Sequence, residues 1–377
     1  MPTAVEYPMI DLTSDDLVIA PPSSLREGAI AALDAGTNHR IDFGGLAPLR
    51  KAVADKLANE TDISWDPADI VITASADEAI IRTVLAILDP GDEAIIIRPC
   101  RPTFPILLLL AGVTPVLVDA RRPRYLPDIS AIRAAVTPKT KAIVINSPND
   151  PTGAVYDRAT LQKIGELAMR FQLWIISDER YSRFIFTGAS HHQSIVMTHP
   201  DVRSLTIVVK AFSNELAATG WRLSYIAAPA EVAFAAKRLQ SHTTTNPSAI
   251  AQHAILHHLQ VSDGSFEREV HQRLAYARNV GLHILSDLRD VAISRADGSF
   301  FFYLDLSRLV SVLAAEGPIQ SSDDIVRLLL DEANVKCVPG SVFGDVNGLR
   351  ISFGAPPDLL EVGLRSIVKT LNRLRRS

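Results

Sequence analysis

The sequence predicts an α/β protein: a large domain with a mostly parallel sheet covered by helices, plus a smaller α+β domain. Between residues 70 and 176, runs of β-branched residues alternate with helical patterns, which is typical of a parallel sheet covered on both faces. After about residue 265 a long charged helix precedes two strands. We therefore expect an N-terminal arm with part of the small domain at 1–40, the large domain at 41–265 and the small domain at 266–377.

The individual elements follow from apolar spacing and from their flanking residues. A helix at 23–35 has a serine cap and ends at Gly36. The expected strands of the large domain are 70–73, 93–97, 114–118, 141–145, 173–176, 205–209 and 223–228. The helices between them are 77–88, 105–111, 129–136 and 161–171. A helix at 266–288 and strands at 299–304 and 348–353 belong to the smaller unit.

Composition excludes several classes of protein. Of the 377 residues, 47% are hydrophobic and 21% charged, which is typical of a folded protein and not of a disordered one. A net charge of −4 gives no basic surface for nucleic acid. No stretch has the length of a membrane span or the pattern of a signal peptide, and the two cysteines lack metal-ligand spacing. We expect a cytoplasmic protein without a metal site.

Five polar segments follow expected strands, at the edge of the sheet where α/β proteins usually keep their chemistry. One of them, the strand-to-helix junction at Ser75, Ala76 and Asp77, has free backbone N–H groups that suit a phosphate. The five segments are 73–79, 101–105, 146–153, 177–181 and 211–222.

The order and spacing of these segments resemble the class I/II aminotransferase family of fold type I, which depends on pyridoxal phosphate (PLP). Segment 146–153 reads Asn-Ser-Pro-Asn-Asp-Pro-Thr-Gly, close to the family's Asn-x-Pro-x-Asn-Pro-Thr-Gly loop. Segment 178–181 matches its Asp-Glu-x-Tyr motif, and the end of segment 211–222 matches the Gly-x-Arg that follows the family's Ser-x-Ser-Lys. The resemblance runs from about residue 10 to 370. It implies PLP or pyridoxamine phosphate as cofactor, an α-amino acid as small-molecule substrate and a homodimer.

The resemblance also implies roles for particular residues. Asp178 would bond the pyridine nitrogen and Tyr181 the ring oxygen, while Phe104 would stack on the ring. Arg222 would bind the phosphate together with the turn at 75–77, since arginine suits a dianion. Arg350 would clamp the α-carboxylate of the substrate.

Several positions depart from the family pattern. Asn214 stands where the family has the lysine that forms the Schiff base, and an amide has no nucleophilic amine. Asp150 replaces an asparagine that donates to the ring oxygen, and a carboxylate can only accept. Ala211 replaces a phosphate-binding serine. Lys210 is the nearest amine, either a strand-end residue or a displaced Schiff-base lysine. The cofactor is therefore not expected as an internal aldimine.

The N-terminal region departs from the pattern too. Asp15 falls near the family's glycine at the mouth of the substrate site, with Asp16 beside it. Arg40 falls near a tyrosine that reaches the phosphate of the partner subunit. One hypothesis is that Asp15 or Asp16 faces a cationic substrate side chain and Arg40 supplies charge across a dimer interface. The alternative is that all three are solvated loop charges.

Three functions remain open from the sequence. The chain is an aminotransferase-family enzyme with an engineered lysine exchange, or a natural lysine-less enzyme of an amino-acid biosynthetic pathway. The third alternative is a non-catalytic binding or partner subunit. In an enzyme without the lysine, Tyr181, Asp150 and Lys210 are the candidate bases.

Overall fold

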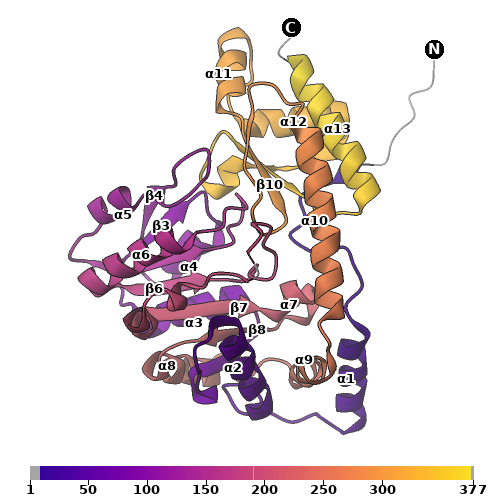
Figure 1. Cartoon of the computed structure of the whole chain (residues 1–377). Helices are drawn as coiled ribbons and strands as arrows, with labels where there is room; N and C mark the ends of the chain where they lie inside the picture. Colours follow the sequence, from indigo (N-terminus) through magenta and orange to yellow (C-terminus); the bar gives the residue numbers. More distant parts are fainter. Residues whose placement is uncertain (1–8, 190, 375–377) are drawn as a thin grey trace.

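The fold is built on a seven-stranded sheet in the first part of the chain and a four-stranded sheet in the second, and the described residues add a short two-stranded sheet (Figure 1). The computed structural model describes residues 9–189 and 191–374, so the first eight residues of the expected arm lie outside it. The large sheet has seven strands in the order β2-β8-β7-β6-β5-β3-β4. These strands are β2 (Ile70–Thr73), β3 (Glu93–Arg98), β4 (Thr114–Asp119), β5 (Thr140–Asn146), β6 (Trp174–Asp178), β7 (Thr206–Ala211) and β8 (Ser224–Ala227).

Most of the large sheet is parallel, as the sequence predicts. Strands β4, β3, β5, β6 and β7 pair in parallel, and β8 runs antiparallel to both β7 and β2. Helices cover both faces of the sheet, so its strands are largely buried except for the edge strand β4 (Figure 1). The helices of this part are α1 (Ser23–Asp34), α2 (Ala47–Thr61), α3 (Ala76–Ile87), α4 (Thr103–Leu110), α5 (Ile129–Ala134), α6 (Arg158–Phe171), α7 (Phe212–Glu215), α8 (Ala230–Ser241) and α9 (Ala249–Val261).

The smaller sheet has four strands in the order β12-β13-β10-β9, all antiparallel. The strand β1 (Ile10–Asp11) returns from the N-terminus to pair with β11 (Val335–Lys336). The remaining strands are β9 (Ala292–Ile293), β10 (Phe301–Asp305), β12 (Val338–Pro339) and β13 (Gly348–Ser352). The helices are α10 (Ser265–Leu285), α11 (Ser307–Glu316), α12 (Ser322–Ala333) and α13 (Pro357–Leu374).

The long helix α10 connects the two sheets. Its first half lies beside the large sheet and its second half packs on α13 in the smaller unit (Figure 1). The two sheets fall on either side of residue 265, where we expect the domain boundary; the boundary itself stays a prediction. Among the described residues, no helix combines the length and the apolar character needed to cross a bilayer.

The sheet brings the polar segments to one edge. Asn146 ends β5, Asp178 ends β6 and Ala211 ends β7, and all three strands point the same way. Strand β2 ends at the same edge, because Thr73 at its end pairs with Ser224 at the start of the antiparallel strand β8. The first turn of α3 follows directly after β2. The candidate site therefore lies at the carboxyl ends of the parallel strands.

Candidate functional site

A cavity of about 380 Å³ lies at this edge of the sheet. It is lined by the first turn of α3, the segment after β6, the segment after β7 and the N-terminal loop. The lining residues are Asp15, Asp16, Ser75, Ala76, Asp77, Arg101, Arg180, Tyr181, Ser213, Asn214, Thr219, Gly220, Arg222 and Ser224. Among the described residues, no cluster of side chains could hold a metal ion.

Asp178 is fully buried and forms an ion pair with Arg180. The Nε atom of Arg180 lies 3.0 Å from Oδ1 of Asp178 and 2.9 Å from Oδ2, and a terminal nitrogen lies 2.8 Å from Oδ2. Both oxygens of Asp178 are thus bound by one guanidinium. Arg180 lines the cavity and Asp178 does not, so the arginine separates the carboxylate from the space in which a ligand would lie.

The same pairing continues across the site. Arg180 also lies 2.9 Å from Asp77, and Arg101 lies 3.7 Å from Asp77. Arg101 in turn donates to Asp150 at 2.9 Å. Together with Asp178 at one end and Arg350 at the other, these residues alternate positive and negative charge. We call Asp178, Arg180, Asp77, Arg101, Asp150 and Arg350 the arginine–aspartate chain.

Charge alternation favours the ionised forms of Asp77 and Arg180. Burial alone would raise the pKa of Asp77, but the guanidinium groups of Arg180 and Arg101 hold it below its usual value. Burial opposes the charge of Arg180 as well, yet Asp178 and Asp77 raise the pKa of its guanidinium. The network is therefore a set of mutually compensated charges, and breaking one pair would leave a buried charge uncompensated.

Arg350 does not line the cavity, and its expected role as a carboxylate clamp stays a prediction. One of its terminal nitrogens donates to Asp150 at 2.9 Å and the other to the carbonyl oxygen of Thr13 at 2.7 Å. Its guanidinium also lies over the ring of Phe301, 4.4 Å from the centroid. The internal ion pair with Asp150 therefore uses one face of the guanidinium that a carboxylate could otherwise bind.

The turn at 101–105 presents a different residue from the one expected. Phe104 is buried in the core beside Leu108 and does not line the cavity, so its expected ring stacking stays a prediction. Arg101 lines it instead. The sequence reasoning missed both Arg101 and Arg180, although each is a charged residue inside a motif that follows a buried strand.

Lys210 lies near the end of β7 but does not line this cavity, and its candidate role as a displaced Schiff-base lysine stays a prediction. Its Nζ atom lies 2.6 Å from Glu60, and the side chain lines a second cavity below the segment after β6. Burial would lower the pKa of this amine, but Glu60 raises it above its usual value. An ammonium must lose its proton before it can act as a nucleophile, so this ion pair disfavours a Schiff base at Lys210.

Three groups facing the first cavity are free to bind a ligand. Asn214 is half-buried at its wall, and its amide has no hydrogen-bond partner in the part of the chain that the structure describes. The hydroxyl of Tyr181 is buried and equally unpartnered within residues 9–189 and 191–374. Arg222 is exposed and makes one long contact, 3.5 Å to the carbonyl oxygen of Thr219.

The remaining predicted residues lie as follows. Ser75 caps α3 by accepting from the backbone N–H of Glu78 at 3.0 Å, and Ala76 begins the helix. Asp15 and Asp16 are exposed at the cavity mouth, and Asp15 lies 3.8 Å from Arg101. Arg40 is exposed and lies outside the cavity of this single chain, so its role across an interface stays a prediction.

The fold and the position of the site define a protein of fold type I, the PLP-dependent transferase fold. The family described as aminotransferase class I and II matches residues 7–367, and this chain belongs to that family.

Relatives and solved structures of this family resemble the chain over nearly its whole length. A probable aspartate/prephenate aminotransferase of Aquifex aeolicus is 33% identical over 94% of this chain and 88% of its own. The aspartate/prephenate aminotransferase of Thermus thermophilus is 32% identical over 97% of this chain and 91% of its own. The aromatic aminotransferase of Pyrococcus horikoshii superposes with a TM-score of 0.91 at 29% identity, covering 98% of this chain and 97% of that one.

The family implies PLP, and the residues of this chain do not fit it. Asn214 offers no amine for a Schiff base, and Arg180 covers the carboxylate that would bond the ring nitrogen. Asp150 would place a negative charge against the ring oxygen, and Asp77 would place one beside the phosphate. Only Arg222 and the hydroxyl of Tyr181 still suit the cofactor. Arg101 and Arg180 line the cavity on the side of Asp178 and Asp150, where the pyridine ring would lie.

Proposed function

We propose that this chain is a lysine-less member of its family that binds a small amino acid noncovalently, as a binding or partner subunit. The observation that carries the proposal is the arginine–aspartate chain. In this chain, Asp178 at the end of β6 and Asp150 in the loop after β5 form internal ion pairs and are therefore unavailable to a cofactor. Asn214 at the family's lysine position supports the same conclusion.

The remaining cavity suits a zwitterion. Arg222 and the amide of Asn214 can donate to a carboxylate, and the exposed carboxylates of Asp15 and Asp16 can accept from an ammonium group. The three aspartates and three arginines of the lining balance in charge, so a ligand carrying one charge of each sign needs no net compensation. Asp15 and Asp16 also favour a second ammonium group, as in a basic amino acid.

Titration calorimetry with L-ornithine and L-aspartate tests this proposal. We expect the wild-type protein to bind L-ornithine more tightly than L-aspartate. We expect Arg222→Gln to weaken both by about tenfold or more, the loss typical of a charged hydrogen bond. Arg327→Gln, an exposed position on α12, is the control. Absence of binding to either amino acid, or unchanged binding by Arg222→Gln, would contradict the proposal.

A second candidate is a lysine-less enzyme that holds PLP or pyridoxamine phosphate noncovalently and acts on an α-amino acid. The unpartnered hydroxyl of Tyr181 and the free guanidinium of Arg222 favour it, because both face the cavity. Retention of the cofactor after dialysis, together with amino-group transfer to a 2-oxo acid, would select this candidate. A single engineered exchange of the lysine is less favoured, since Arg101, Arg180 and Asp77 depart from a cofactor site together.

The expected homodimer remains part of the proposal. Light scattering coupled to size-exclusion chromatography measures it: a mass near twice 41.0 kDa supports a dimer. A mass near that of the single chain would contradict it and would remove any role of Arg40 in a neighbouring site.

A further inference from the structure

Helices α1 and α9 pack closely against each other, side by side in Figure 1. Gly28 permits the close approach: a Cβ atom there would lie 2.7 Å from Cβ of His257 and 2.9 Å from Cα of Ala254. Ser24 lies one helical turn before Gly28, and His258 lies one turn after Ala254. The packing of the two helices therefore brings Ser24 next to His258.

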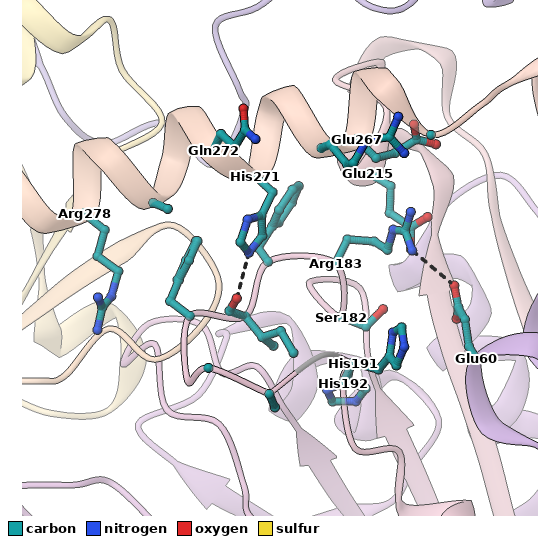
Figure 2. Close-up of a pocket in the computed structure, with 18 of the residues that line it drawn as sticks. Glu60, Ser182, Arg183, His191, His192, Glu215, Glu267, His271, Gln272 and Arg278 are labelled. Carbon is teal, nitrogen blue, oxygen red and sulfur yellow. Dashed lines mark hydrogen bonds and ion pairs between the residues drawn. The ribbon is translucent and has the colours of Figure 1, made fainter.

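Ser24, His258 and Glu267 form a chain of hydrogen bonds across three helices. The Oγ atom of Ser24 lies 2.7 Å from Nδ1 of His258. The Nε2 atom of the same ring lies 3.2 Å from a carboxylate oxygen of Glu267, in the first turn of α10. Figure 2 shows Glu267 on this helix, at the wall of the cavity that Lys210 also lines. A hydroxyl, an imidazole and a carboxylate thus follow one another at hydrogen-bond distance.

Glu267 sets the direction of the hydrogen bonds. Burial would raise the pKa of Glu267, but the hydrogen bond with His258 holds it below its usual value. An ionised carboxylate can only accept, so Nε2 of the neutral imidazole carries the proton and Nδ1 accepts from the hydroxyl of Ser24. The side chain of His258 is 2% exposed, which keeps its ring in this orientation. A general base that removes the proton of a serine needs the same arrangement.

The serine end of the chain lies at the surface. Ser24 is half-buried between exposed neighbours, while His258 is buried beneath it. Ser24 is the second residue of α1, and the N-cap residue Pro22 offers no side-chain acceptor to the first turn. Backbone N–H groups in the first turn of a helix have no acceptor within the helix. Together with the helix dipole they stabilise an oxygen that gains negative charge.

We propose that Ser24, His258 and Glu267 form a second active site, which hydrolyses small uncharged carboxylic esters. Ser24 is the nucleophile, His258 is the general base and Glu267 is a positioning residue. The exposed carboxylate of Glu27, one turn after Ser24, disfavours an anionic acyl group. The proposal does not depend on the function of the first site, because none of the three is among the described residues that line the first cavity.

The reaction consumes one ester and one water. The Oγ atom of Ser24 bonds to the carbonyl carbon while its proton passes to Nδ1 of His258. The bond from that carbon to the alcohol oxygen breaks, and the alcohol leaves with the proton from His258. Water then attacks the acyl group on Ser24, again giving a proton to His258. The carboxylic acid leaves and the serine hydroxyl is restored.

p-Nitrophenyl acetate and an alkyl fluorophosphonate are the probes, used on the full chain. We expect saturable hydrolysis of the ester, and peptide mass spectrometry should locate the phosphonyl group on Ser24. Ser24→Ala should abolish both reactions, and His258→Gln should slow hydrolysis by about 100-fold or more, the effect typical of a lost general base. Ser23→Ala, at the exposed neighbouring serine, is the matched control and should leave hydrolysis unchanged. Thermal unfolding of each variant checks that the fold is kept.

Glu267→Gln tests the positioning role. We expect kcat to fall by about tenfold or more with KM unchanged, because Glu267 orients the imidazole and does not touch the ester. An unchanged kcat in Glu267→Gln would overturn that role. A phosphonyl group on another residue, unchanged hydrolysis by Ser24→Ala, or no hydrolysis by the wild-type protein would overturn the active site. The three residues would then only connect α1, α9 and α10.

Discussion

Two arginines change what the site can bind. Asp178 ends a strand of the sheet and would be open to a ligand if the residue two positions later were small and apolar. Arg180 instead binds both of its oxygens and reaches Asp77 as well. Arg101 binds one oxygen of Asp150, and Arg350 binds the other. Each carboxylate that would contact a cofactor already has a cation at hydrogen-bond distance.

Restoring the amine should therefore not restore the cofactor. We expect Asn214→Lys to form no Schiff base with PLP, because Arg180 still covers Asp178 and Asp150 still faces the ring oxygen. Absorbance spectra with added PLP, followed by borohydride reduction and peptide mass spectrometry, measure the adduct at residue 214.

The double variant Asn214→Lys, Arg180→Ala is the matched comparison, since it also uncovers Asp178. We expect it to take up more PLP than the single variant. Binding of PLP and transamination by Asn214→Lys alone would contradict this expectation. The lysine would then be the one group that the cofactor site lacks, and the arginine–aspartate chain would not exclude the cofactor.

Single residues of the site were predictable to different degrees. The motifs placed Asp178, Tyr181, Arg222 and Asn214 at one edge of the sheet, because strand ends follow directly from apolar patterns. Which partner each charge takes was not predictable. The ion pair of Arg350 is an example: its partner Asp150 is 200 positions away, and only the fold brings them together.

At the scale of the element, the first turn of α3 has the features of an anion-binding helix N-terminus, but its anion is a side chain of the same helix. The helix is capped by Ser75, and its dipole favours negative charge in the first turn. Asp77 supplies that charge from within the chain. A helix terminus that could receive a phosphate thus carries its own anion.

The cap itself should be measurable. We expect Ser75→Ala to lower the free energy of unfolding by about 1 kcal/mol, because the backbone N–H of Glu78 loses its acceptor. Urea unfolding followed by circular dichroism measures this change. Ser265→Ala, in the first turn of α10 with an exposed side chain, should change it by less than about 0.5 kcal/mol. Equal effects of the two substitutions would remove the capping role.

The elements themselves follow closely from the sequence. The strand expected at 70–73 and the helix at 129–136 are observed as β2 (Ile70–Thr73) and α5 (Ile129–Ala134). Buried β-branched strands and amphipathic helices are encoded locally, so apolar spacing locates them. The direction of β8 depends on how distant strands pair, and its antiparallel pairing with β2 and β7 came only from the structure.

For the whole molecule, the buried cluster of Glu60, Lys56 and Lys210 connects α2 to the centre of the sheet. Burial would raise the pKa of Glu60, but Lys210 and Lys56 hold it far below its usual value. The pKa of Lys210 is raised in return. A lowered carboxyl pKa stabilises the fold above about pH 4 and a raised lysine pKa stabilises it below about pH 10, so the full contribution lies between them.

Removing Glu60 should show this pH dependence. We expect Glu60→Gln to lower the free energy of unfolding at pH 7 by about 3 kcal/mol, since two buried ammonium groups lose a partner. This difference in the free energy of unfolding should shrink as the pH falls below about 4, because the carboxyl groups of the unfolded chain are then protonated and the ionised Glu60 contributes less to stability. Chemical denaturation at pH 7 and pH 3 measures both values. Glu231→Gln, exposed on α8, is the control, and a pH-independent difference would contradict the pairing.

The most direct test of the central claim, that the arginine–aspartate chain replaces the cofactor, is a PLP-retention measurement. The purified full-length protein is incubated with PLP, divided, and one half reduced with borohydride before peptide mass spectrometry. The other half is dialysed and assayed for bound cofactor. We predict no pyridoxyl group on residues lining either cavity and no PLP retained after dialysis. A retained equivalent of PLP per chain, or a pyridoxyl group on Lys210, would contradict this claim.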